Sequence, residues 1–235
     1  MAPTIVLIRH AQALHNIDKN HSLPDPELSE LGRTSQCTEL RKSLGKRFHD
    51  LTDVAIIVSP MRRTIETAQL SLSWLINKGV RLEADARWQE NSAKPCDTGS
   101  PIEALREEFP TVDFSNVDPV YPDKTSPAGA RYAYNRKAIL ARGRSALASL
   151  ASRPEKVIFV VSHSGFLRAG LTGYWWFNAD YRIFDLDEAV AGTGDPAGLK
   201  QWESTLAGGL GWSRTYTVPL GDALPEEDVV DPPDV

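Results

Sequence analysis

The chain has 235 residues, with 26 Lys and Arg against 31 Asp and Glu, and part of the acidic excess lies after Gly221. The near-neutral body argues against nucleic acid or an anionic membrane as the main partner, and no apolar run approaches the roughly 20 residues that span a bilayer. Cys37 and Cys96 are too few for a disulfide framework and show no zinc-site spacing. We therefore expect a cytoplasmic protein with one sizeable domain, no metal and no cofactor.

The first predicted strand is the apolar run Ile5–Ile8, which suits a strand buried on both faces of a parallel sheet. Arg9 and His10 follow at its carboxyl end, the edge of an open α/β sheet where ligands bind. A cation and an imidazole there are candidates for an anion site with a nucleophile or a base. The alternative is a strand-end arginine beside a capping histidine, and this dipeptide does not decide between the two.

Apolar spacing predicts the remaining elements in chain order. After a short helix or turn over 11–20 and a proline-containing loop, we expect helices over 33–49, 61–78, 136–152 and 166–177, and strands over 53–58, 80–82, 157–161, 183–186 and 214–218. This alternation predicts an α/β fold: a three-layer α/β/α sandwich with a mostly parallel central sheet.

Prolines break residues 91–135 into loops around one short helix, over 102–108. We interpret this segment as a small cap inserted over the C-terminal edge of the sheet. The expected organisation is a single domain over 1–220, followed by an acidic, disordered tail over 221–235.

Charged residues also follow the later strands. Arg62 and Arg63 lie in the first turn of a predicted helix, where the macrodipole disfavours cations, so a bound anion would compensate; the alternative is a solvated pair. Glu90 follows the third strand and is either a proton donor or a surface carboxylate. The strand over 157–161 runs into His163 and repeats the geometry of the first strand.

Parallel strands deliver their carboxyl ends to one edge of a sheet, so these imidazoles and guanidiniums are expected to converge. Such a pocket suits a phosphoryl group, because arginine donors match phosphate oxygens and a neutral imidazole is a nucleophile. Attack on phosphorus would give a phosphohistidine that water hydrolyses, with Glu90 supplying the proton for the leaving alkoxide. His15 is expected to be a solvated loop residue, with the pocket mouth as the alternative.

Four blocks resemble the motifs of the histidine phosphatase superfamily, phosphoglycerate mutase-like branch, in the family's order and as far as about Arg168. They are LIRHAQALHN, with Ala11 where Gly is usual, PELSELGR, SPMRRTIETA and VSHSGFLR. The resemblance implies a phosphate pocket of Arg9, His10, Arg63 and His163, with His10 phosphorylated during turnover. It also implies Asn16 and Ser164 as further phosphate contacts and Glu90 as the proton donor.

The segment PCDTGS, residues 95–100, resembles a stretch of fungal members and so implies a fungal source. The residues after Asn16 and after Glu90 lack the segments familiar from the mutases, which favours a phosphatase acting on a small-molecule phosphate monoester. The alternatives are a phosphoglycerate mutase-type phosphoryl transfer, or a phosphate-binding or biosynthetic protein that reuses the pocket. The oligomeric state is left open.

Overall fold

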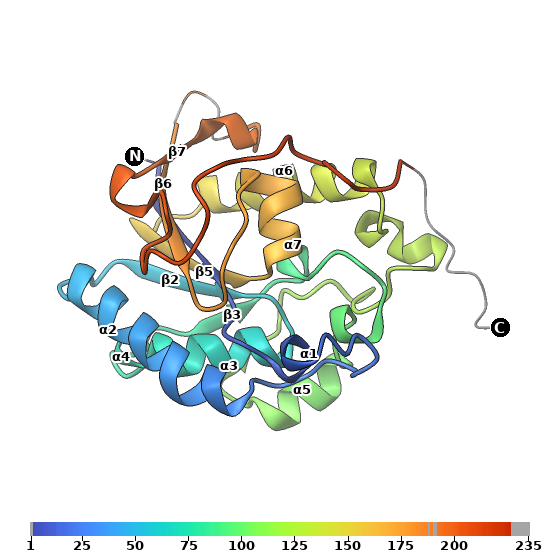
Figure 1. The fold of residues 1–235 in the computed structure, drawn as a ribbon, viewed down its shortest axis with the longest axis horizontal. Helices are drawn as coiled ribbons and strands as arrows, with labels where there is room; N and C mark the ends of the chain where they lie inside the picture. Colours follow the sequence, from blue (N-terminus) through green and yellow to red (C-terminus); the bar gives the residue numbers. More distant parts are fainter. Residues whose placement is uncertain (1, 188, 190–191, 227–235) are drawn as a thin grey trace.

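The structure is a computed structural model that describes residues 2–187, 189 and 192–226 (Figure 1). Its central sheet has seven strands in the order β4-β3-β2-β5-β1-β6-β7. The strands are β1 (Thr4–Arg9), β2 (Val54–Val58), β3 (Leu82–Ala84), β4 (Val112–Asp113), β5 (Val157–Ser162), β6 (Tyr181–Leu186) and β7 (Leu199–Gln201). Every pair from β4 to β1 is parallel, whereas β6 and β7 are antiparallel to their neighbours. The predicted mostly parallel sheet is therefore confirmed.

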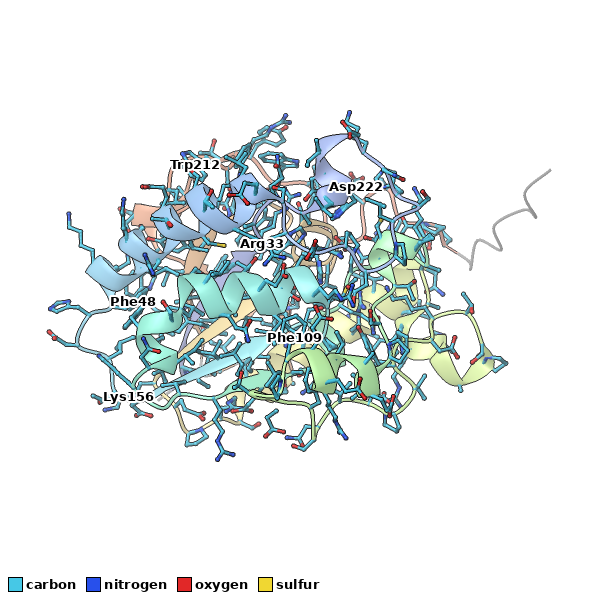
Figure 2. All side chains as sticks on the ribbon, turned by 90° about the horizontal axis from the view of Figure 1, so that it is seen from below. Arg33, Phe48, Phe109, Lys156, Trp212 and Asp222 are labelled. Atoms are coloured by element: carbon cyan, nitrogen blue, oxygen red, sulfur yellow. The ribbon has the colours of Figure 1, made fainter. Side chains whose placement is uncertain are left out.

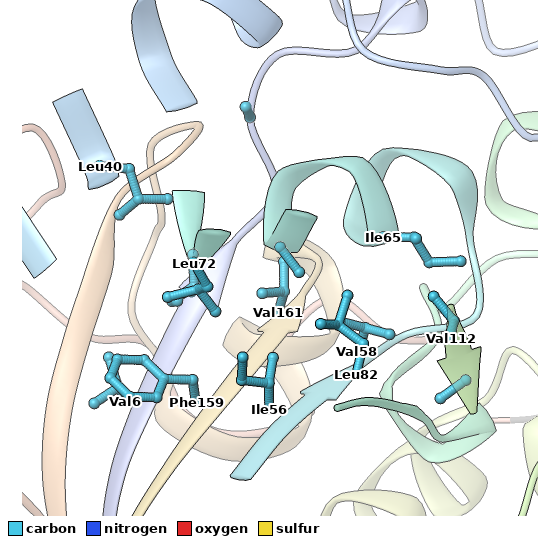
Figure 3. Close-up of a cluster of buried hydrophobic side chains, with 14 of the residues drawn as sticks. Val6, Leu40, Ile56, Val58, Ile65, Leu72, Leu82, Val112, Phe159 and Val161 are labelled. Carbon is cyan, nitrogen blue, oxygen red and sulfur yellow. The ribbon is translucent and has the colours of Figure 1, made fainter. Parts of the chain in front are cut away.

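Helices cover both faces of this sheet, as the α/β/α prediction requires. Beside the short α1 (Leu14–Ile17), the helices α2 (Cys37–Arg47), α3 (Arg62–Ser71), α4 (Ser73–Ile76) and α5 (Ile102–Glu108) lie on one side in Figure 1, and α6 (Arg136–Ala151) and α7 (Ser164–Phe166) on the other. Alternate residues of β1 enter the two cores: Val6 packs with Leu40 and Leu72 (Figure 3), and Ile5 packs with Leu147 of α6. The central strands are buried on both faces because successive side chains point to opposite sides.

Two predicted helices end earlier than their apolar patterns suggested. The helix over 61–78 is divided into α3 and α4 at Leu72, after Ser71, whose hydroxyl donates to the Thr67 carbonyl and so competes with the helical hydrogen bonds. The helix over 166–177 begins at Ser164 and continues as a π-helix, η5 (Leu167–Thr172). It ends at Gly173, whose φ of 71° is left-handed and whose missing Cβ would lie 2.3 Å from the Val218 carbonyl oxygen.

The sheet edges differ from the sequence prediction. Residues 214–218 do not form an edge strand, because β7 already pairs with β6, and Thr217 makes only an isolated bridge to Tyr174. At the opposite edge, β4 comes from the predicted cap, so that part of residues 91–135 belongs to the sheet. The division into one domain over 1–220 with a cap over 91–135 stays a prediction.

The start of the predicted disordered tail makes defined contacts. The Gly221 amide donates to the Ala169 carbonyl, and the Arg136 amide donates to the Pro225 carbonyl. Residues 221–226, which include the Asp222 labelled in Figure 2, therefore lie against the body of the protein. The rest of the tail lies outside the described residues. Among the helices of the described chain, none is long and apolar enough to cross a membrane.

Candidate active site

The two histidine-bearing strands are neighbours in the sheet. In the parallel pairing of β1 with β5, Arg9 lies opposite Ser162, so the next residues, His10 and His163, leave the sheet side by side. Their ring centroids are 5.2 Å apart in an edge-on arrangement. The structure thus brings together the two imidazoles that the sequence analysis placed at one sheet edge.

Backbone and arginine contacts fix the His10 ring. Its Nδ1 lies 2.7 Å from the Ala11 carbonyl oxygen, so Nδ1 carries the proton, and Nε2 accepts from Arg63 Nε at 3.2 Å. Burial, followed by the charges of Arg63 and Arg9, holds the pKa of His10 well below 6.5. His10 is therefore a neutral imidazole whose Nε2 bears a lone pair, the form that a nucleophile needs.

Ala11 fits where the family motif has glycine. Its φ is not positive, since the positive values among the described non-glycine residues belong to other positions. The Ala11 amide donates to Thr67 Oγ1 at 3.0 Å, while its carbonyl accepts from His10. The methyl group is therefore accommodated without backbone strain.

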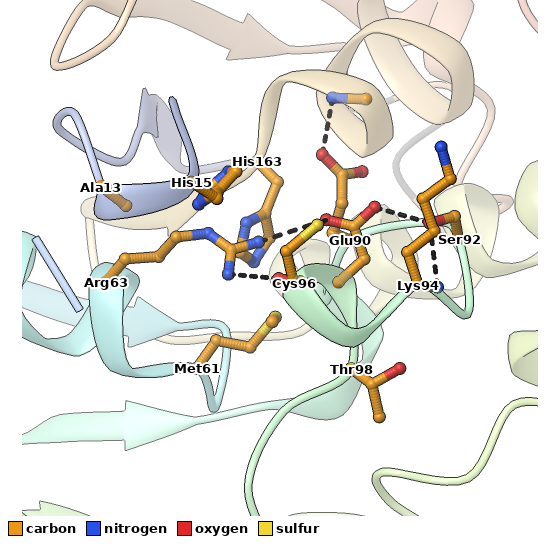
Figure 4. Close-up of polar contacts among 12 residues, drawn as sticks. Ala13, His15, Met61, Arg63, Glu90, Ser92, Lys94, Cys96, Thr98 and His163 are labelled. Atoms are coloured by element: carbon orange, nitrogen blue, oxygen red, sulfur yellow. Dashed lines mark hydrogen bonds and ion pairs between the residues drawn. The ribbon is translucent and has the colours of Figure 1, made fainter. Parts of the chain in front are cut away.

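The adjacent side chains of Arg62 and Arg63 differ in burial and in their partners. Arg62 pairs with Glu108 at 2.8 Å near the surface, whereas Arg63 is 1% exposed and reaches the histidines (Figure 4). Arg63 Nη1 donates to the Cys96 carbonyl at 2.7 Å, and Nη2 lies 3.6 Å from Asp97 Oδ1. Helix α3, which carries Arg63, and the main chain at Cys96 therefore hold this guanidinium beside His10.

Arg9 supplies a second guanidinium at the same edge. Its Nη1 donates to the Trp176 carbonyl at 2.6 Å, and its Nε is buried without a hydrogen-bond partner in the described residues. Burial lowers the pKa of Arg9 to about 10, so it keeps its charge at neutral pH. An unsatisfied buried N–H favours an anionic ligand that would accept from it.

His163 has one engaged and one unengaged ring nitrogen. Nε2 lies 2.9 Å from Ser59 Oγ, and Nδ1 is buried with no partner among the residues described. Burial, followed by the charge of Arg63, holds the pKa of His163 well below 6.5. The ring is neutral and leaves Nδ1 available to a ligand.

Glu90 follows the short helix η2 (Ala86–Trp88) and reaches the same edge. Its two carboxyl oxygens accept from the Asn91 amide at 2.8 Å and from the Gly165 amide at 3.0 Å, a contact drawn in Figure 4. Burial and the neighbouring charge of Asp97 raise the pKa of Glu90. A carboxyl beside the histidines whose pKa is raised has the property required of a general acid.

Asn16 and Ser164 have weaker links to this cluster. Asn16 Oδ1 accepts from the Ala13 amide at 3.0 Å, and Nδ2 lies 2.9 Å from His15 Nε2. Ser164 directly follows His163 and is half-buried. Neither side chain hydrogen-bonds to Arg9, His10, Arg63 or His163 within the described residues, so their role as phosphate contacts stays a prediction.

The expectation that His15 is solvated is wrong. Its side chain is only 7% exposed, and its ring centroid lies 6.0 Å from that of His10. Burial and the charge of Arg63 lower the pKa of His15 to about 3. The bridge between Ala13 and Leu28 folds this turn inward, a long-range contact that local polarity does not reveal.

Two residues of the site were missed by the sequence analysis. Lys124 is 5% exposed, and its ammonium donates to the carbonyls of Glu90 (2.8 Å), Ser92 (2.9 Å) and Asp97 (2.5 Å). Asp97 also accepts from the Ser92 hydroxyl at 2.6 Å. Asp97 lies in the PCDTGS stretch, whose resemblance to family members could have drawn attention to this residue. Nothing in the sequence around Lys124 singles it out.

Contacts between the family blocks support the loop after His10. Glu66 accepts from the Leu28 amide and from Arg33, and a Cβ on Gly32 would lie 2.2 Å from the Gln12 carbonyl oxygen. These contacts pack the turn at 28–33 against residues 11–13. No group of three or more metal-ligating side chains is found in the described part of the chain.

Comparison with known proteins identifies the family of this chain. The family model of the histidine phosphatase superfamily, branch 1, matches residues 5–189. A "probable phosphatase" of Schizosaccharomyces pombe is 33% identical over 165 residues, covering 68% of this chain and 73% of the relative. The "phosphoglycerate mutase-like protein 1" of Arabidopsis thaliana is 32% identical over 200 residues, covering 70% and 69%.

The fold also matches solved structures. A "putative alpha-ribazole-5'-P phosphatase" of Escherichia coli superposes with a TM-score of 0.52 at 18% identity, covering 80% of this chain and 92% of that one. At this identity the likeness concerns the fold alone. Given the match of the family model, the chain belongs to the histidine phosphatase superfamily, branch 1, and is an enzyme of the phosphoric monoester hydrolase class.

Proposed function

We propose that this protein is a metal-independent phosphatase that hydrolyses a small-molecule phosphate monoester through a phosphohistidine on His10. The observation that carries the proposal is the state of the His10 ring: the Ala11 carbonyl accepts a hydrogen bond from Nδ1–H, and the lone pair of Nε2 faces Arg63. Neutral Nε2 beside the buried guanidinium of Arg63 and the half-buried Arg9 is suited to attack phosphorus, since the arginines stabilise the charge of the transferring group.

The proposed reaction has two steps. In the first, His10 Nε2 forms a bond to phosphorus as the ester P–O bond breaks, and Glu90 gives its proton to the departing alkoxide. In the second, water attacks the phosphohistidine, Glu90 takes a proton from that water, and the N–P bond breaks to release inorganic phosphate. Arg9, Arg63 and His163 bind the phosphoryl oxygens in both steps.

Release of phosphate from p-nitrophenyl phosphate in the presence of EDTA tests this proposal. Wild-type protein should turn over, and His10→Ala should lose at least about a thousandfold in kcat, because the proposed first step needs the His10 Nε2 nucleophile. His49→Ala is the matched control, since its side chain is exposed and, among the described residues, pairs only with Asp50. Wild-type activity in His10→Ala would remove His10 from the nucleophile role.

Trapping the intermediate gives an independent test. Protein quenched during turnover of a 32P-labelled ester should retain label that is lost in acid and kept in base, as expected for a phosphoramidate. The relative named a probable phosphatase supports hydrolysis, whereas a coupled assay in which a monophosphoglycerate isomerises faster than it is hydrolysed would favour the mutase. A cytoplasmic location and a fungal source stay predictions from the sequence.

A further inference from the structure

A third imidazole, that of His15, lies beside the proposed nucleophile. Its side chain is 7% exposed, and its ring centroid is 6.0 Å from that of His10, against 5.2 Å between His10 and His163. Figure 4 shows the ring next to the guanidinium of Arg63. The two proposed reaction steps give His15 no part, although burying a polar ring costs free energy unless its nitrogens are hydrogen-bonded.

The side chain of Asn16 fixes which nitrogen of His15 carries the proton. Asn16 Oδ1 accepts from the Ala13 amide at 3.0 Å and from Asn178 Nδ2 at 3.4 Å, so the other end of this amide, Nδ2, is a donor. Nδ2 lies 2.9 Å from His15 Nε2, which therefore accepts. Burial and the charge of Arg63 lower the pKa of His15 to about 3, so the ring is neutral near pH 7 and its proton is on Nδ1.

His15 Nδ1 is thus a buried donor, and it has no acceptor among the described residues. Arg9 Nε and His163 Nδ1 are buried without a partner in the same part of the chain. Arg9 precedes His10, and the rings of His15 and His163 adjoin it, so all three nitrogens belong to residues around the imidazole that the proposed reaction phosphorylates. A ligand that accepts from these N–H groups would offset the cost of burying them.

We propose that His15 is a further substrate-binding residue, whose Nδ1–H donates to a non-bridging oxygen of the phosphoryl group held at His10. A phosphoryl group on His10 Nε2 takes the place where Arg63 Nε now donates, and its oxygens are strong acceptors. A neutral imidazole adds a donor there without a further cation beside Arg9 and Arg63. Asn16 acts through His15 by holding the ring in the donating tautomer. This inference rests on the proposed function and adds a residue to its phosphate pocket.

Three substitutions at residue 15 separate the donor from the shape of the ring. In His15→Asn the amide nitrogen lies as many bonds from Cβ as Nδ1 does in histidine, so the proposed donor is kept. In His15→Gln the amide lies one bond further out, at the position of Nε2, so an acceptor for Asn16 is kept and the donor at Nδ1 is lost. His15→Phe keeps a ring and loses both groups.

Two quantities are measured: kcat/KM for p-nitrophenyl phosphate, and the dissociation constant of tungstate, a tetrahedral dianion, by isothermal titration calorimetry. His15→Gln and His15→Phe should weaken both by about ten- to a hundredfold, as expected for loss of a hydrogen bond to a charged group. His15→Asn should stay within about threefold of the wild type. His49→Phe is the control, since that histidine is exposed and distant in sequence from the site motifs, and should change neither quantity by more than about twofold.

Equal losses in His15→Asn and His15→Gln would assign His15 a packing role and overturn the inference. Values within about twofold of the wild type in His15→Gln would overturn it too, and this pair decides the question even where His15→Phe does not fold. Tungstate binding separates the two levels. If its affinity follows the expected order while no ester is hydrolysed, the proposed phosphatase fails and the anion contact stands; if hydrolysis proceeds regardless of residue 15, only the contact fails.

Nitrogen-15 NMR of the free protein tests the tautomer without any ligand. The His15 signals, assigned by their loss in His15→Gln, should show a protonated Nδ1 and an unprotonated Nε2 near pH 7. A proton on Nε2 would leave Nδ1 without a hydrogen to donate and would contradict the inference.

Discussion

Replacing Lys124 by methionine probes how the cap holds the proposed acid. The ammonium of Lys124 donates to three carbonyls, those of Glu90, Ser92 and Asp97, and methionine has similar length but no donor. Leaving a buried acceptor without its partner destabilises by about 1–3 kcal/mol, and water can reach part of this segment. We therefore expect Lys124→Met to lower the free energy of unfolding by about 3 kcal/mol.

The same change should loosen the segment that carries Glu90 and Asp97. Because a displacement of about 1 Å at a catalytic group can reduce a rate about a hundredfold, kcat for p-nitrophenyl phosphate should fall by at least about tenfold in the fraction that stays folded. Urea unfolding gives the stability change, and assays well below the unfolding midpoint give kcat. Lys137→Met is the control, since Lys137 is exposed on α6.

A stability loss below about 1 kcal/mol, with kcat unchanged, would refute this reasoning. It would mean that the three carbonyls find water or other donors at no cost, and that the cap does not position the acid. Lys124→Arg adds a second measurement: if charge alone matters, arginine should restore stability, whereas if the three-way geometry matters, it should not.

Three further predictions concern the acid and the buried histidines. Because the proposed acid acts only in its protonated form and burial raises the pKa of Glu90, kcat/KM should fall as pH rises through that pKa. Glu90→Gln should abolish this alkaline limb of the pH profile, and a limb that persists would assign it to another group. Gly165→Ala places a Cβ 2.5 Å from Glu90 Oε1, so kcat should fall with little change in stability, whereas Gly45→Ala, with open space around it, should leave kcat unchanged. The pKa values of His10 and His163 lie below 6.5 in the folded chain, so below that pH the unfolded chain binds more protons than the folded chain does. The free energy of unfolding should therefore fall as the pH falls below 6.5, by up to about 1.4 kcal/mol per pH unit for each histidine. A free energy of unfolding that stays constant between about pH 6.5 and 5 would contradict this.

The parts of the site that the sequence predicted lie next to strongly patterned strands. His10 and His163 each follow an uninterrupted apolar run, and parallel pairing then fixes them as neighbours without further information. Arg63 needed the helix start as a second signal, and the structure separates it from Arg62 by burial. These residues could be predicted because periodicity identifies buried strands and the ends of those strands define the binding edge of the sheet.

The residues that were missed depend on contacts between distant segments. Lys124 lies in an irregular stretch, and its burial arises because this later part of the cap folds onto the carbonyls of Glu90, Ser92 and Asp97. His15 was misjudged for the same reason, since its burial depends on the contact between Ala13 and the distant Leu28. At the sheet edges, β7 is three residues long, too short for its alternation to be distinguished from that of a loop.

Main-chain carbonyls hold much of the site. The Ala11 carbonyl accepts a hydrogen bond from His10, the Trp176 carbonyl accepts one from Arg9, and the Cys96 carbonyl accepts one from Arg63. A carbonyl is present whatever side chain its residue bears, so these positions are free to change identity while the backbone path is kept. Substitutions at these three positions can therefore accumulate without moving the histidine and arginine side chains that their carbonyls hold. We expect side-chain variation at Cys96 and Trp176 to affect packing first and the orientation of the arginines last.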